Sequence, residues 1–220
     1  MAELSGATFV HVDDHLLVAD KPAGLLCVPG RGADKQDCLS ARVQQHYPDA
    51  LIVHRLDMAT SGLCVLARGP MVQRQLSMAF AAREVHKRYV AVVHGKLASP
   101  DGDKWSVIDL PLSPDWPNRP LSKVDLDNGK PSLTRWRVLA HDDASNTTRV
   151  ELEPVTGRSH QLRLHLQAIG HPILGDALYA PPSVQALAPR LLLHATALTL
   201  PHPVDARPLQ FHSPAPFAIG

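Results

Sequence analysis

The chain lacks long apolar runs, paired cysteines and a secretion signal. No apolar stretch approaches the roughly 20 residues that span a bilayer, and the N-terminus lacks the charged-then-apolar plan of a signal peptide. These absences argue against a membrane protein and favour a cytoplasmic one. The three cysteines are odd in number and form no Cys-x-x-Cys pair, which is typical of free thiols rather than of a disulfide framework.

The chain also has little net charge, +1 over 220 residues, so charge alone does not indicate a nucleic-acid-binding protein. The distribution is uneven, because Lys and Arg outnumber Asp and Glu over residues 54–96 and, less strongly, over residues 155–220. A near-neutral protein can still present a basic face, since phosphate binding depends on local potential. A solvated charged face remains the commoner explanation of such a pattern.

Apolar periodicity predicts more strands than helices, without regular alternation of the two. We expect a hairpin over residues 8–19 and helices over 38–46, which Asp37 would cap, and over 70–84. A third helix should begin near Thr156 or Ser159 and stop at Gly170. Further strands are expected at residues 51–53, 63–67, 88–94, 105–110, 132–140, 147–153, 191–200 and 209–212. This order favours an α+β fold over a doubly wound α/β fold.

A polar loop joins two of the apolar strands, at residues 51–53 and 63–67. His54, Arg55 and Asp57 follow the first strand directly, and Gly62 leads into the second. Short connections held between rigid strands present many active-site groups, and a carboxylate there can act as a nucleophile or a base. A nearby arginine would keep it ionised. The local pattern leaves a plain Arg–Asp surface pair as an alternative.

The loop His54-Arg55-Leu56-Asp57-x-x-Thr60-Ser61-Gly62 resembles the signature of the RluA-type pseudouridine synthases. Other segments, in the family's order, carry the resemblance over about residues 15–213. They are Lys21-Pro22-Ala23-Gly24, Lys87-Arg88-Tyr89, Gly129-Lys130-Pro131-Ser132, Gly157-Arg158-Ser159-His160-Gln161-Leu162-Arg163-x-His165, Gly170-His171-Pro172-Ile173-Leu174-Gly175-Asp176 and Leu192-Leu193-His194-Ala195. The segment Asp115-Trp116-Pro117-Asn118-Arg119-Pro120 is similar to the namesake dual-specificity subgroup.

The resemblance implies a fold and a reaction. The expected fold is a central, largely antiparallel mixed β-sheet flanked by helices and loops, forming one catalytic domain over residues 1–220 without an S4 RNA-binding domain. The expected reaction is isomerisation of uridine to pseudouridine in RNA, by base flipping and without cofactor or metal. The implied partners are large-subunit (23S) rRNA and the anticodon stem-loop of some tRNAs. The protein is expected to act as a cytoplasmic monomer without an obligate protein partner.

The resemblance also implies roles for individual residues. Asp57 would be the catalytic carboxylate, Arg158 would pair with it, and Tyr89 would stack on the flipped base. Arg55 would enter the RNA helix, and Leu193 would form an apolar wall of the uracil pocket. His54 is a further candidate for substrate binding. The RNA-contact candidates are Asn118, Arg119, Lys123, Lys130, His160 and Arg163, of which the last two are expected on one exposed helical face.

Three other readings compete with this one. A metal hydrolase would use His160, His165 and His171, but a spacing of five does not place the first two on one helical face as a His-x-x-x-His pair does. A non-catalytic RNA-binding relative would not need Asp57, Tyr89 and Arg158 together. A nucleosidase would break the same glycosidic bond but release free uracil.

Overall fold

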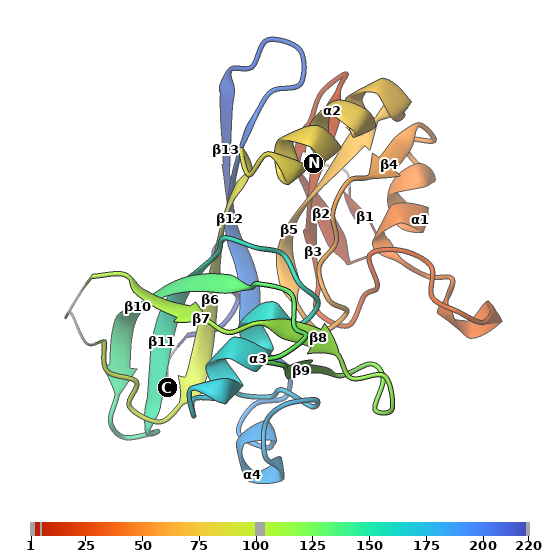
Figure 1. Ribbon diagram of the computed structural model, residues 1–220. Coiled ribbons are helices and arrows are strands. Elements are labelled where there is room, and N and C mark those ends of the chain that lie inside the picture. The colour runs from red at the N-terminus through yellow and green to blue at the C-terminus, as the bar shows by residue number, and fades with distance from the viewer. Residues whose placement is uncertain (1–2, 5, 100–103, 219–220) are drawn as a thin grey trace. The chain divides into compact units, whose positions relative to one another are not determined.

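The computed structural model describes residues 3–4, 6–99 and 104–218, which fold into two compact units (Figure 1). The first unit comprises residues 1–87 and 195–215, and the second comprises residues 88–194 and 216–220. Antiparallel strands dominate both units and helices are few, so the predicted α+β class is confirmed. The expectation of a single catalytic domain without an S4 domain stays a prediction.

The first unit is a sheet with two helices beside it. Within it the strand order is β1-β2-β3-β5-β12, with β4 pairing β5 and β13 pairing β12. Its elements are β1 (Glu3–Leu4), β2 (Ala7–Val12), β3 (Leu16–Lys21), the 3-10 helix η1 (Ala33–Lys35), α1 (Leu39–Gln44), β4 (Ala50–Ile52), β5 (Ser61–Arg68), α2 (Gly69–Ala81), most of β12 (Leu193–Pro201), and β13 (Pro208–His212).

Alternating apolar residues build the core of this unit. Leu16 and Val18 of β3 lie level with Ala67 and Val65 of β5 in an antiparallel register, and all four side chains are buried. Helix α2 lies over β4 and β5 (Figure 1) and buries Val72, Leu76 and Ala79 against them. Val72 and Leu76 lie on one side of this helix, because residues four apart along a helix share a face, and the helix predicted over residues 70–84 is confirmed as α2. The core leaves the β4–β5 connection at its edge.

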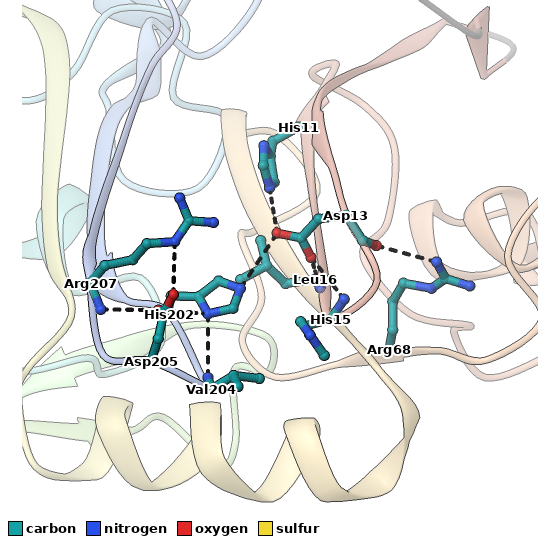
Figure 2. A network of polar contacts seen from close by, with 9 residues as sticks. All are labelled: His11, Asp13, His15, Leu16, Arg68, His202, Val204, Asp205 and Arg207. Carbon is teal, nitrogen blue, oxygen red and sulfur yellow. Dashed lines mark hydrogen bonds and ion pairs between the residues drawn. The ribbon is translucent and has the colours of Figure 1, made fainter.

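A polar network closes the β2–β3 turn of the first unit (Figure 2). Asp13 accepts hydrogen bonds from the backbone N–H groups of His15 and Leu16, both at 2.8 Å, and bonds to His11 Nε2 at 2.8 Å. Burial opposes the ionisation of Asp13, but these hydrogen bonds outweigh it and lower the pKa of Asp13 to about 2. Buried His202, from the β12–β13 turn, lies 3.7 Å from the same carboxylate. The network therefore ties two turns together.

The second unit is a sheet in the order β6-β11-β10-β7 with a separate two-stranded hairpin. Its elements are most of β6 (His86–His94), β7 (Ser106–Asp109), β8 (Leu112–Pro114), β9 (Ser122–Val124), β10 (Leu133–Asp142), β11 (Thr147–Pro154), α3 (Gln161–Ala168) and α4 (Pro182–Gln185). Helix α3 packs against β9, β10 and β11. The hairpin formed by β8 and β9 was not predicted from the sequence.

The structure corrects the predicted caps of two helices. Asp37 does not cap α1, which begins after Cys38; its carboxylate instead forms an ion pair with Arg42 at 2.6 Å. Helix α3 is preceded by His160 in the left-handed conformation rather than capped by Thr156 or Ser159. Its predicted end is confirmed, since Gly170 has a φ of 86°, a conformation that glycine adopts without steric cost.

Candidate active site

The loop that carries Asp57 lies between the paired strands β4 and β5. The pairing ends at Ile52, level with Leu66, and the chain then leaves the sheet until Ser61. Asp57 is half-buried and its carbonyl accepts the Thr60 N–H at 3.1 Å, while Arg55 is exposed. The ends of two paired strands therefore present both side chains on the connection over residues 53–60, and the sequence predicted such a loop between strands.

The return from this loop requires a glycine. Gly62 has a φ of 113°, and a Cβ added there would collide with the backbone of Ala195 on the neighbouring strand β12. Only glycine combines this conformation with so close an approach of two backbones. The position just after the loop is thus fixed by packing rather than by chemistry.

Lys21 holds the backbone of the Asp57 loop through a hydrogen bond. Its side chain is fully buried, and the ammonium donates to the carbonyls of Pro22 at 2.8 Å, Leu25 at 2.7 Å and Met58 at 3.1 Å. The Met58 carbonyl, directly after Asp57, also accepts the N–H of Gly24 at 2.8 Å. Charged donors make the stronger hydrogen bonds, so this buried lysine holds the backbone beside the carboxylate. The Lys-Pro-x-Gly turn was identified as part of the family resemblance, but no role was predicted for Lys21.

His54 holds the start of the loop. Its Nε2 accepts the N–H of Val65 at 3.0 Å, so the imidazole is neutral, and its ring stacks on Phe80 with centroids 4.8 Å apart. Burial, reinforced by the charge of Lys87, lowers the pKa of His54 to about 3. The Nε2 atom of His54 is therefore occupied by a hydrogen bond that stabilises the fold. The predicted role of His54 in substrate binding stays a prediction.

Two buried thiols contact the backbone of the same loop. The Leu56 N–H donates to Cys27 Sγ at 3.2 Å, and Cys64 Sγ donates to the His54 carbonyl at 3.8 Å. The neighbouring Cys64 thiol lowers the pKa of Cys27. All three cysteines are free and buried, in agreement with the sequence-based expectation.

The other candidates for catalysis belong to the second unit. Tyr89 lies in β6 opposite Leu152 of β11 and is 9% exposed, and Leu193 is 3% exposed at the start of β12. Arg158 is exposed, and its Nη2 donates to the Pro131 carbonyl at 3.4 Å. The roles of these three residues, including the pairing of Arg158 with Asp57, stay predictions.

The hairpin of β8 and β9 presents four of the RNA-contact candidates, all of them exposed. They are Asn118, Arg119, Lys123 and Lys130. Lys130 extends the hairpin, because its N–H and carbonyl both pair with the backbone of Leu112, at 2.8 and 3.0 Å. The cations therefore stand on a hydrogen-bonded scaffold, and their contact with RNA stays a prediction.

Helix α3 does not offer the exposed face that its spacing predicted. Arg163 is 3% exposed and forms a two-pronged ion pair with buried Asp176, at 2.8 and 2.6 Å. A guanidinium held in this way cannot reach RNA, so the predicted contact by Arg163 is corrected to a structural role. His160 is half-buried, and its Nδ1 bonds to the Tyr179 hydroxyl at 2.7 Å. Its predicted RNA contact stays a prediction.

The three histidines of the metal-site alternative bond to different groups. His160 bonds to Tyr179, His165 to Thr134 Oγ1 at 2.9 Å and to the Leu110 carbonyl at 3.0 Å, and His171 to the His94 carbonyl at 2.9 Å. Among the residues that the structure describes, no three His, Cys, Asp or Glu side chains gather in a metal-binding arrangement. In the same residues, no helix has the length and apolarity to cross a membrane.

Comparison with known proteins accounts for this arrangement. Residues 15–168 match the family model of RNA pseudouridylate synthases. The chain is 50% identical over 208 residues to the dual-specificity RNA pseudouridine synthase RluA of Escherichia coli K12, covering 94% of this chain and 93% of the relative. It is 49% identical to the RluA of Yersinia pestis, covering 94% and 98%.

Solved structures give the same result. Human RNA pseudouridylate synthase domain containing 1 is similar with a TM-score of 0.80 and 27% identity, covering 99% of this chain and 87% of that one. Human RNA pseudouridylate synthase domain containing 4 gives a TM-score of 0.72 and 26% identity, covering 94% and 88%. On its sequence, its fold and the loop that carries Asp57, this chain belongs to the RNA pseudouridylate synthase family.

Proposed function

We propose that this enzyme converts uridine to pseudouridine in two RNA classes, large-subunit (23S) rRNA and the anticodon stem-loop of tRNA, with Asp57 as its catalytic carboxylate. The observation that carries the proposal is the loop itself. A single carboxylate lies in the connection from β4 to β5, and a buried ammonium and two thiols hold the backbone on either side of it. Relatives of about half-identical sequence are named as dual-specificity enzymes.

The reaction needs no oxidant and no energy input. The bond between N1 of uracil and C1′ of the ribose breaks, the uracil turns, and a bond from C5 to C1′ forms. The proton on C5 is lost and N1 gains one, so atoms and electrons balance. A well-positioned carboxylate can serve such a reaction as nucleophile or as base. The uridine must leave its stack before either can act.

The supporting roles follow the family resemblance. Arg55 is exposed beside Asp57 and suits insertion into RNA, where it would take the place of the extruded base. Tyr89 would stack on the base, Leu193 would wall its pocket, and Arg158 would keep Asp57 ionised. The exposed hairpin cations and His160 would contact phosphates or base edges. The proposal places the enzyme in the cytoplasm, where both RNA classes are found, and treats it as a monomer.

Replacement of Asp57 by Asn tests the catalytic assignment. The variant is isosteric but uncharged, so we expect pseudouridine formation to fall at least a thousandfold while RNA binding is largely kept. Nucleosides from a digested tRNA transcript and an rRNA fragment would be quantified by chromatography. Asp143→Asn is the matched control, because the Asp143 side chain is 80% exposed. Wild-type rates in Asp57→Asn, or release of free uracil by the wild type, would contradict the proposal.

A deletion strain tests the substrate range. Pseudouridine maps of its rRNA and tRNA should each lose a site that expression of the wild-type gene restores and the Asp57→Asn gene does not. Loss from only one RNA class would reduce the proposal to a single-class enzyme. Unchanged maps of both classes would overturn the choice of substrates.

A further inference from the structure

The turn between β8 and β9 exposes a tryptophan that no assigned role uses. Trp116 is 66% exposed, and the guanidinium carbon of Arg119 lies 3.6 Å from the centroid of its indole ring. One face of the indole thus carries a cation while most of the residue's surface stays open to solvent. Exposing so large an apolar group is unfavourable in water, so the arrangement suggests a binding surface.

The exposed indole stands on an ordered turn. The Asp115 N–H donates to the Leu121 carbonyl at 2.9 Å, and the Leu121 N–H donates to the Asn118 carbonyl at 3.0 Å. The Asn118 side-chain amide also donates to the Asp115 carboxylate at 2.9 Å. Pro117 and Pro120 restrict the backbone between them. The ring is therefore held in place before any partner arrives, which reduces the entropy lost on binding.

A second set of bonds fixes the base of the hairpin. The Ser122 N–H donates to the Tyr179 hydroxyl at 2.9 Å, and that hydroxyl also bonds to His160 Nδ1. Lys123, on the next residue of β9, is exposed. The hairpin therefore exposes the Trp116 ring, the Arg119 guanidinium stacked on it and the Lys123 side chain.

This combination fits an unpaired base with its phosphate. Unstacked bases of RNA stack on aromatic rings and on guanidinium planes, and such stacking tolerates different bases because every base has a π-face. Cations beside the ring suit the phosphate of the same nucleotide. An enzyme that extrudes a uridine works on RNA whose neighbouring bases are already disturbed.

We propose that Trp116 and Arg119 form a stacking platform for an unpaired base of the substrate RNA that is not the reacting uridine. The inference rests on the proposed function, because it assumes an RNA substrate. Because the net charge of the protein is small, electrostatic attraction alone would hold the RNA weakly, and stacking on Trp116 would add to the affinity. Stacking tolerates different bases, so one platform can serve two RNA classes.

Binding measurements on the Asp57→Asn enzyme test the platform without requiring turnover. Adding Trp116→Ala should weaken affinity for the stem-loop RNA about 10-fold or more, whereas Trp116→Phe should lose only a few-fold. Leu126→Ala is the matched control, because Leu126 is an exposed apolar residue of the same region, 76% exposed, without a guanidinium over it. It should bind as the parent does. Equal affinities for the parent and Trp116→Ala would overturn the inference.

Removal of single bases from the RNA identifies the stacked nucleotide. Abasic substitution at one unpaired position, outside the modified uridine, should weaken binding to the parent but not to Trp116→Ala. If every abasic RNA loses affinity equally in both proteins, the platform does not exist. A change in oligomeric state with Trp116→Ala and unchanged RNA affinity would instead indicate a protein interface, and would also overturn it. Failure of the proposed function would appear separately, as absence of pseudouridine with the wild-type enzyme.

Discussion

The loop that carries Asp57 and the turn that carries Trp116 are both short connections between paired strands, yet they are held in opposite ways. The first is anchored by buried groups, the Lys21 ammonium, the His54 imidazole and two thiols. The second is held by its own backbone, by the exposed side-chain hydrogen bond from Asn118 to Asp115 and, at its base, by the Tyr179 hydroxyl. Hydrogen bonds from buried groups restrict the position of a catalytic carboxylate, whereas hydrogen bonds at the surface are sufficient to expose a ring for stacking. The comparison predicts that substitutions of the groups that hold the Asp57 loop lower the stability of the protein strongly, and that substitutions in the Trp116 turn lower it little.

Lys21→Met should produce the largest effect on stability. Three carbonyls would lose their charged donor inside the protein, which should cost about 3 kcal/mol or more in the free energy of unfolding. Urea denaturation measures this. Lys123→Met changes an exposed lysine of the hairpin and should shift stability by less than about 0.5 kcal/mol. Similar midpoints for the two variants would remove the contrast between buried and surface anchors.

His54→Phe should come next, at about 1–3 kcal/mol, because the Val65 N–H would lose its acceptor. His54→Gln can keep an acceptor there and should recover part of the loss. Pseudouridine formation should follow the same order, since the loop begins at this residue. If the phenylalanine variant is as stable and active as the glutamine variant, the hydrogen bond does not position the loop.

The same histidine gives a pH dependence. Its pKa is about 3 in the folded protein against 6.5 in the unfolded chain, so below pH 6.5 the unfolded chain binds a proton that the folded protein does not. Stability should therefore fall as the pH drops from 6.5 towards 3, by up to about 1.4 kcal/mol per pH unit from this group. Denaturation at a series of pH values should show a steeper acid loss in the wild type than in His54→Gln. Parallel curves would contradict the assigned pKa.

Tyr179→Phe tests the hairpin side of the comparison. The Ser122 N–H and His160 would lose their shared hydroxyl, at a cost of about 1 kcal/mol. RNA affinity should weaken a few-fold, because the platform would be less well held, while the rate at saturating RNA should be kept. A collapse of stability as large as that of Lys21→Met would show that the hairpin is not independent of the core.

Asp13→Asn should cost up to about 2 kcal/mol in the free energy of unfolding at pH 7, because the lowered pKa of Asp13 bounds the contribution of its charge to the network in Figure 2. Asn keeps an acceptor for the N–H groups of His15 and Leu16 but loses the charge that His11 and His202 face. Because the pKa of Asp13 is about 2 instead of 3.8, its contribution is present above pH 3.8 and is lost as the pH falls through 2. Denaturation at pH 7 and pH 2 should differ less in the variant.

Strand positions were predictable where an apolar run is buried on both faces. β3 and β5 contain such runs, because every residue over 16–19 and over 61–67 is buried, and the spacing of Val72 and Leu76 marks helix α2. The β8–β9 hairpin was missed because its strands are three residues long and its turn is rich in proline. Periodicity needs several repeats, and short strands do not provide them.

The candidate site divides in the same way. Arg55 and Asp57 could be located because a polar loop between apolar strands is a local signal. Arg163 was expected on an exposed face but is buried. Its partner, Asp176, lies thirteen residues further along the chain, so the spacing of residues within the helix does not reveal the ion pair. Lys21 was overlooked for a similar reason, since the Met58 carbonyl that it holds lies 37 residues away.

The division of the chain into units has a consequence for how the protein is made. The core of the first unit combines Leu16 and Leu63 with Leu198 and Leu209, and these last two are synthesised more than 130 residues after the first two. Almost all of the second unit, residues 88–194, emerges before them. The core of the unit begun first is therefore closed only after residues 88–194 have been made, so a chain that stops before β12 would lack the strands that complete this core.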